Sequence, residues 1–198
     1  MPRLNGAILA PNWLGDVVMS LPALAALRAA TGEQKWTVLA RPSVAGIYRM
    51  APLGMEVEPL PARFHRLPRL RVREVILMPN AFHAALWGLR LGARRRVGYA
   101  RDGRGWLLHP AIPAPAPGSL PGHESFHYLE LLRRAGYLEA LPAERPAPAR
   151  VPLTAPAGLQ AQWRERLAAG GAPIIALHAG SAFGAAKCWL PDRFAAGA

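Results

Sequence analysis

The sequence has almost no cysteine and no long uninterrupted apolar run. Cys188 is the one cysteine among 198 residues, so no disulfide forms within the chain, which is typical of a reducing compartment. No run reaches the roughly 18 apolar residues of a membrane span. The apolar region near the N-terminus is interrupted by Asn12, Gly15 and Asp16, and a helix explains it better than a signal peptide does. These features favour a globular cytosolic protein.

Lysine and acidic residues are also scarce. Of the 24 basic residues 22 are arginine, only 12 residues are acidic, and the formal net charge is +12. Such an excess attracts anions, such as phosphorylated lipid, nucleotide or nucleic acid. The densest arginine clusters are at 63–73 and 94–104, although a solvated face is the commoner meaning of such clusters. No His, Cys or carboxylate pair has zinc-like spacing, and no serine lies in a GxSxG frame.

The chain is organised around residues 7–30. Residues 7–10 form a short apolar run typical of a buried strand, residues 11–16 form a turn, and the apolar residues that follow have helical spacing. A strand, a short turn and a helix open an α/β sheet, and in such sheets ligands bind at the carboxyl ends of the strands. The turn is therefore the first candidate site.

Asn12, Gly15 and Asp16 are the polar or small residues of this turn. Their place at a strand end makes them candidates for binding or catalysis. The alternative is that Asp16 only caps the helix N-terminus. Pro22 leaves the start of this helix open. The helix begins near Asp16 with a kink, or near Ser20 without one, and in the second case Asp16 lies in the loop.

The rest of the first domain repeats the same pattern. Asn80 follows a continuous apolar run of the kind found in strands buried on both faces, so it lies at the same sheet edge as Asn12 and Asp16, and it is expected to cap the next helix. Gly136 is expected to close a later helix, and 110–122 is a Pro/Ala-rich loop. Strands are predicted at 36–40, 55–60, 75–78, 95–99 and 106–109, and helices at 43–50, 80–91 and 126–135.

A Pro/Ala-rich tract at 142–156 marks the predicted domain boundary, which separates domain 1–152 from domain 153–198. The second part contains an expected helix at 157–169 and an apolar strand at 173–178. A lone strand–loop–helix cannot bury both of its faces. The sequence therefore predicts one whole α/β domain followed by the first unit of a second, incomplete one.

The loop after the strand at 173–178 has the composition of a phosphate site. Gly180, Ser181 and Gly184 offer backbone N–H groups and one hydroxyl, and Lys187 adds a positive charge. This combination suits a phosphate or a diphosphate, although it is neither a Walker A sequence nor GxGxxG. The alternative for Lys187 is a solvated surface lysine.

Four pieces of the chain together resemble glycosyltransferase family 9, the ADP-heptose:lipopolysaccharide heptosyltransferases, and its heptosyltransferase II branch most closely. These pieces are APNWLGDVVMSLPALAALR, ILMPNAFHAALWGLRLGARRRVGY, HESFHYLELLRRAGY and ALHAGSAFGAAKCWLPDRFA. The most specific parts are W-L-G-D near the start and G-S-x-x-G-x-x-K-x-W near the end.

The resemblance implies a two-domain GT-B fold with Rossmann-like halves that face each other across a cleft. The N-terminal half would bind the lipopolysaccharide inner-core acceptor and the C-terminal half the ADP-heptose donor. Transfer would invert the anomeric carbon without a metal or cofactor. Asp16 would be the general base. The implied acceptor-binding residues are Asn12, Trp13, Gly15, Asn80, His123 and Glu124, and the implied donor-phosphate residues are Gly180, Ser181 and Lys187.

The resemblance further implies a cytoplasmic enzyme that is peripheral at the cytoplasmic face of the inner membrane and binds no nucleic acid. Because most of the donor domain is missing, residues 1–198 alone are expected to be inactive. Two alternatives stay open. The +12 charge could serve a nucleic-acid-binding module. The opening strand–turn–helix could also belong to another nucleotide-binding α/β protein, such as a dinucleotide-dependent oxidoreductase.

Overall fold

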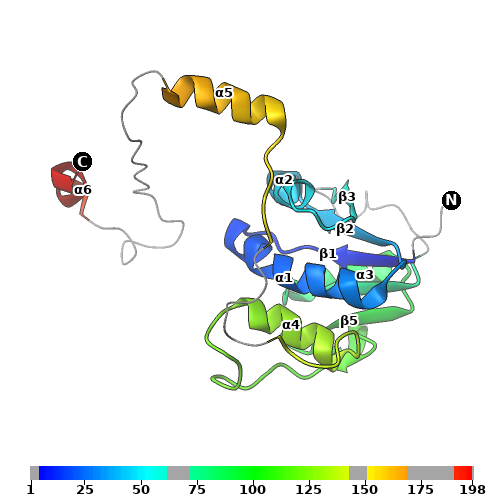
Figure 1. The fold of residues 1–198 in the computed structure, drawn as a ribbon. Helices are drawn as coiled ribbons and strands as arrows, with labels where there is room; N and C mark the ends of the chain where they lie inside the picture. The colour runs from blue at the N-terminus through cyan, green and yellow to red at the C-terminus, as the bar shows by residue number, and fades with distance from the viewer. Residues whose placement is uncertain (1–4, 62–71, 143–150, 169–189, 198) are drawn as a thin grey trace. The chain divides into compact units, whose positions relative to one another are not determined.

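The computed structural model describes residues 5–61, 72–142, 151–168 and 190–197 (Figure 1). The chain divides into two compact units, Met1–Thr154 and Ala155–Ala198. The second unit contains the helices α5 (Ala157–Ala168) and α6 (Pro191–Gly197). The strand expected at 173–178 and the loop that follows it lie outside the described residues.

The first unit is built on a parallel six-stranded sheet of the order β3-β2-β1-β4-β5-β6. This order places β1 beside β4 and confirms the predicted Rossmann-like α/β fold. The strands are β1 (Gly6–Leu9), β2 (Trp36–Ala40), β3 (Glu56–Pro59), β4 (Glu74–Leu77), β5 (Arg95–Tyr99) and β6 (Ala111–Ile112). The helices are α1 (Leu14–Thr31), α2 (Pro42–Met50), α3 (Phe82–Arg90), the 3₁₀ turn η2 (Gly105–Leu107) and α4 (Ser125–Arg134).

Helices cover both faces of this sheet (Figure 1). Side chains alternate along a strand, so that Ile8 of β1 joins the core under α1, α2 and α4, whereas Ala7 and Leu9 join the core under α3 and η2. The central strands β1 and β4 are buried at every position. Burial on both sides explains why these strands are apolar apart from Glu74 at the start of β4.

Helix α1 begins earlier than either predicted start. Trp13 is its N-cap, with no side-chain cap hydrogen bond, and Asp16 lies in its first turn. Asp16 is therefore not the cap, and the start near Ser20 is also wrong. Pro22 lies inside the helix. Ser20 also lies within it and donates a hydrogen bond from its hydroxyl to the Val17 carbonyl at 2.7 Å. The tertiary packing of α1 outweighs the local preference of proline for the first helical turn.

Among the described helices, α1 is also the one that is long and apolar enough to cross a membrane by length and composition. One side of this helix packs within the domain. Val17, Leu21, Leu24 and Leu27 are buried in the core that also contains residues of α4. Leu14 and Val18 are 58% and 39% exposed, so this packing accounts for part of the apolar character of α1.

Three further local predictions are wrong, at least in part, and a fourth holds. Ala81, not Asn80, is the N-cap of α3, because the side chain of Asn80 is engaged by residues far away in the sequence. Residues 106–109 are not a strand. They contribute to η2 and to a single antiparallel bridge between His109 and Arg96. The short strand β6 lies within the expected loop 110–122. Gly136 closes α4 at a φ of 81°, as predicted.

Candidate functional site

A cavity of about 600 Å³ lies at the carboxyl edge of β1 and β4. Its walls come from the turn after β1, the turn after β4 and the start of α4. It contains five of the residues predicted from the sequence, Asn12, Trp13, Asp16, Asn80 and Glu124. The other lining residues are Pro11, Met78, Pro79, Ala81, His83, Arg101, His127 and Tyr128. The sheet order explains why segments that are distant in sequence meet here, since the strand order reverses between β1 and β4.

Asp16 is exposed and sits in the first turn of α1. The positive end of the helix dipole attracts a carboxylate at this position. The negative charge of Asp16 also acts on Tyr128, another residue that lines the cavity. Burial raises the pKa of Tyr128, and the charge of Asp16 raises it further. A carboxylate at a helix start that faces a cavity is placed to accept a proton from a bound hydroxyl.

Arg104 holds the turn after β4 in place. Its side chain is fully buried, and it donates to the Tyr99 carbonyl from Nε at 2.9 Å and to the Pro79 and Ala81 carbonyls from Nη1 at 2.6 and 3.0 Å. Its Nη2 lies 3.4 Å from Asn80 Oδ1. Burial lowers the pKa of Arg104 to about 10, so the guanidinium stays charged at neutral pH and keeps all of these bonds.

The partly buried His127 is the second anchor of Asn80. The amide nitrogen of Asn80 lies 3.3 Å from His127 Nε2. The His127 ring stacks at 4.5 Å against Tyr99, whose hydroxyl donates to the His127 carbonyl at 2.7 Å. Burial lowers the pKa of His127, so the imidazole is neutral at neutral pH and its Nε2 can accept the amide hydrogen bond.

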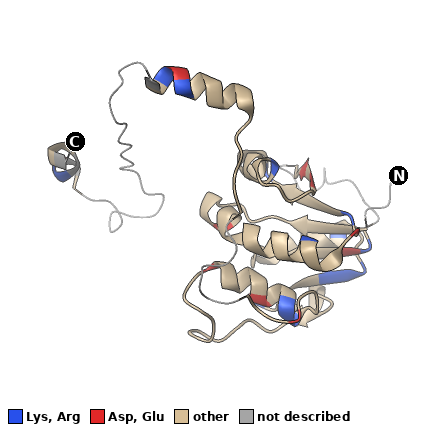
Figure 2. Cartoon of the chain, viewed as in Figure 1, with Lys and Arg blue, Asp and Glu red and all other residues tan. Residues whose placement is uncertain are grey.

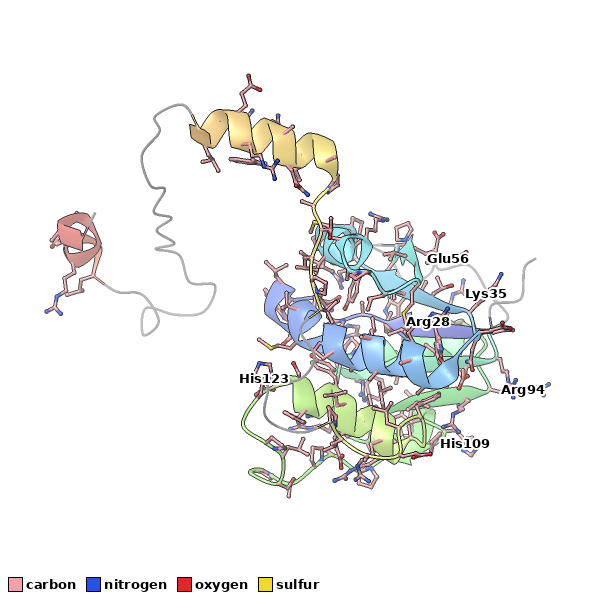
Figure 3. The ribbon with its side chains drawn as sticks, viewed as in Figure 1. Arg28, Lys35, Glu56, Arg94, His109 and His123 are labelled. Atoms are coloured by element: carbon pink, nitrogen blue, oxygen red, sulfur yellow. The ribbon has the colours of Figure 1, made fainter. Side chains whose placement is uncertain are left out.

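A second cavity of about 430 Å³ lies next to the first and shares Arg101, Glu124 and His127 with it. Its remaining wall is the Pro/Ala-rich loop of residues 114–123, which includes His123. Figure 3 shows His123 at the start of α4, at the end of the domain opposite to Arg94. The shared residues make the two cavities one continuous hollow with a single exposed cation, Arg101, among the described arginines and lysines that line it.

The structure brings together most, but not all, of the predicted site residues. Gly15 is exposed in the first turn of α1 and lines neither cavity. Gly180, Ser181 and Lys187 lie outside the described residues. Within the described part of the chain, no group of three or more His, Cys, Asp and Glu side chains is arranged to hold a metal ion.

Sequence reasoning missed three residues of this hollow or its support, namely Arg101, Arg104 and His127. Arg101 and Arg104 belong to the basic cluster 94–104, and nothing in the cluster distinguishes the exposed arginine from the buried one. His127 lies on the predicted helix of α4. A polar residue on the apolar face of that helix is the one signal that was available for it.

Comparisons with known proteins identify the fold. No protein-family model matches the sequence, and no curated protein matches it either. Among solved structures, the chain is similar to E. coli ADP-heptose lps heptosyltransferase II, with a TM-score of 0.73 and 23% identity over 94% of this chain and 57% of that one.

Two further solved structures are similar. A glycosyl transferase family 9 protein from Veillonella parvula has a TM-score of 0.73 and 15% identity, over 98% of this chain and 58% of that one. E. coli heptosyltransferase WaaC with ADP has a TM-score of 0.57 and 18% identity, over 73% of this chain and 51% of that one. The chain thus has a fold of the family 9 heptosyltransferase type and spans a little over half the length of the first two structures.

Proposed function

We propose that this chain contains the acceptor-binding part of an inverting glycosyltransferase that transfers a heptose from an ADP-activated donor to the lipopolysaccharide inner core. The observation that carries the proposal is the carboxylate of Asp16 at a cavity of about 600 Å³, on the carboxyl edge of a sheet that has the heptosyltransferase-type fold. Heptosyltransferase WaaC has been solved with ADP and with ADP-2-deoxy-2-fluoro heptose, which supports a nucleotide-sugar donor.

The chemistry of the cavity suits a sugar acceptor. Its volume lies within the roughly 300–1,000 Å³ of ordinary ligand sites. Asn12 and Asn80 offer amide donors and acceptors for hydroxyl groups, and Glu124 offers a carboxylate. Arg101 lines both parts of the hollow and would bind a carboxylate or phosphate of the acceptor.

In the proposed reaction, Asp16 takes the proton from the attacking acceptor hydroxyl. The hydroxyl oxygen bonds to the anomeric carbon of the heptose as the bond from that carbon to the diphosphate oxygen breaks, which inverts the configuration. The transition state has oxocarbenium character, as in glycoside cleavage. Gly180, Ser181 and Lys187 would bind the donor diphosphate and stabilise the departing ADP.

Asn12, Trp13, Gly15, Asn80, His123 and Glu124 remain the proposed acceptor-binding residues. A lipid-linked acceptor and a basic chain further support a place at the cytoplasmic face of the inner membrane, where the protein would be peripheral.

The test uses a protein that joins this chain to a complete donor-binding half. Asp16→Asn is expected to lower the turnover of heptose transfer by roughly 10²–10⁴, because the proton acceptor is lost, with little change in donor affinity. Lys187→Ala is expected to weaken ADP-heptose binding, as measured by calorimetry. Glu33→Gln, an exposed carboxylate at the far end of α1, is the control for the loss of one charge. Normal turnover of the Asp16→Asn protein would contradict the base assignment.

A further inference from the structure

The outer face of α3 is apolar and exposed. Phe82 and Leu89 are seven residues apart and therefore lie on one side of the helix, whereas Leu86 is partly buried against the core under α3. Phe82 is 39% exposed and Leu89 is 50% exposed. The opposite side, with Ala84 and Ala85, is buried against the sheet. A helix that is apolar on both sides is normally covered on both sides, but the sheet covers only one side of α3.

Trp106 of η2 extends this face beyond Phe82. It is 75% exposed, the highest value among the large apolar side chains in the described part of the chain. Its ring centroid lies 6.4 Å from that of Phe82. We call Phe82, Leu89 and Trp106 the apolar stripe. Its partly exposed side chains continue from the carboxyl edge of the sheet to the C-terminal end of α3.

Basic residues outnumber acidic ones around the apolar stripe. Residues 75–101 contain no acidic residue, and the exposed Asp102 is the acidic residue that follows them. Arg94 follows α3 and Arg101 follows β5, and both are exposed. Figure 2 shows basic residues at the start of β5; of these, Arg95 and Arg96 also bond within the domain. The stripe therefore favours an anionic partner over a neutral or cationic one.

We propose that the apolar stripe docks on an anionic lipid bilayer. Exposed Trp and Phe side chains are typical of the membrane–water interface, and apolar side chains combined with nearby cations are the pattern of interfacial binding to anionic lipid. Helix α3 has 9 residues, far fewer than the roughly 20 of a membrane-spanning helix, so it would lie on the bilayer. A second copy of the chain is a poorer partner, since a symmetric contact would bring like charges together.

The position of the stripe connects it with the candidate site. Ala81 and His83 line the larger cavity on either side of Phe82 in the sequence. Docking at Phe82 and Trp106 would therefore hold the mouth of the cavity next to the bilayer surface, where a lipid-linked acceptor is present. The choice of lipid as the partner rests in part on the proposed function, whereas the exposure and the charge of the stripe do not.

The experiment measures cosedimentation of the 198-residue chain with vesicles of phosphatidylglycerol and phosphatidylcholine, and with pure phosphatidylcholine vesicles. The wild-type chain is expected to bind the anionic vesicles, and less so at high salt. The Phe82→Glu/Trp106→Glu double variant is expected to bind them at least about tenfold more weakly, because it loses apolar burial and adds repulsion. Leu153→Glu, at an apolar position 43% exposed outside the stripe, is the matched control and should bind like wild type. Circular dichroism verifies that each variant is folded.

Equal binding of wild type and double variant, or no binding of either, would overturn the proposal. So would concentration-dependent dimerisation in sedimentation that the double variant abolishes while vesicle binding is absent. The vesicles contain no lipopolysaccharide. Transfer is assayed separately, on a detergent-solubilised acceptor, with the protein that joins this chain to a complete donor-binding half. Vesicle binding without transfer would count against the proposed function alone, and transfer without vesicle binding would count against the docking surface alone.

Discussion

At the scale of single residues, Arg104 connects the two loops that border the cavity. Its guanidinium bonds to the end of β5 through Tyr99 and to the turn after β4 through Pro79, Ala81 and Asn80. Only a planar group with several donors can reach carbonyl groups on two different loops at once. Arg104 is therefore the residue on which the position of Asn80 in the cavity depends most.

Replacing Arg104 is expected to destabilise the folded domain. Arg104→Ala is expected to lower the free energy of unfolding by roughly 3 kcal/mol or more, since it removes the hydrogen bonds of a fully buried side chain to Tyr99, Pro79, Ala81 and Asn80 and leaves a cavity in its place. Urea unfolding followed by circular dichroism measures this loss. Arg104→Lys should recover little of it, because an ammonium group cannot span the same acceptors. The matched control is the exposed Arg101, whose change to Ala should stay within about 0.5 kcal/mol. A similar effect of both substitutions would contradict the anchoring role.

His127 predicts how stability depends on pH. Its pKa in the folded protein is lowered by burial below the unfolded value of about 6.5, so the unfolded chain binds more protons as the pH falls below about 6.5. The stability that the neutral imidazole ring contributes is therefore fully present above about pH 6.5 and decreases as the pH falls below that value. Between about pH 7 and pH 5, urea unfolding should show a smaller decrease in stability for His127→Gln than for wild type. His109→Gln, at an exposed histidine, should retain the wild-type profile.

At the scale of secondary-structure elements, close packing decides where glycine is required. A Cβ atom on Gly6 of β1 would lie 2.5 Å from Trp36 Cε3 of β2, and Trp36 is buried with its Nε1 donating to Thr31 at 3.0 Å. Gly46 of α2 has open space around its Cα. The same substitution therefore has opposite consequences in these two elements.

Gly6→Ala is expected to destabilise the domain by about 1–3 kcal/mol, because the buried indole ring cannot move away. Gly46→Ala should stabilise it by up to about 1 kcal/mol, because alanine is the better helix former. Thermal unfolding of both variants compares them directly. Equal melting temperatures of the two variants would contradict the close contact between Gly6 of β1 and Trp36 of β2.

An element can be predicted from the sequence when the residues that determine it lie within the element itself. The strands β1, β2 and β4 are mainly apolar because they are buried on both faces, and such runs are visible in the sequence. The start of α1 was not predictable, since Trp13 is an N-cap without a side-chain hydrogen bond and the usual capping residue, Asp16, follows it by three positions.

The candidate site was predictable only in part, for the same reason. Asn12, Asp16 and Asn80 follow strands, and the carboxyl ends of parallel strands share one edge. The burial of Arg104 and His127 results from contacts with Pro79, Tyr99 and Asn80. Those contacts depend on the order of the strands in the sheet, which no local pattern specifies.

At the scale of the whole molecule, the formal net charge of +12 is larger than the positive charge that is available to bind an anionic partner. Several arginines are engaged in bonds within the domain. Arg95 bonds to the Ala135 carbonyl and lies 3.5 Å from Glu74. Arg96 bonds to the Leu107 and Ala93 carbonyls. On α4, Arg133 and Arg134 both pair with the buried carboxylate of Glu130, and these hydrogen bonds lower the pKa of Glu130. A large part of the arginine content therefore stabilises the fold.

This use of arginine bears on the nucleic-acid alternative. If most cations of the cluster 94–104 are engaged in internal bonds, binding to duplex DNA should neutralise few phosphates. A filter-binding titration should then give a slope of log K against log salt that is shallower than about −3, equivalent to about three phosphates. A slope near −6 or steeper would favour a nucleic-acid-binding protein and weaken the glycosyltransferase proposal.

The central position of β1 has a consequence for the order in which the domain assembles. Gly6 of β1 pairs with Trp36 of β2 on one edge and with Glu74 of β4 on the other. During synthesis from the N-terminus, the strands β1, β2 and β3 can associate first, but the second edge of β1 stays open until β4 has left the ribosome. An unpaired, apolar strand edge is the usual starting point for aggregation. Slow translation between β3 and β4 would therefore prolong the stage at which this chain is most dependent on chaperones.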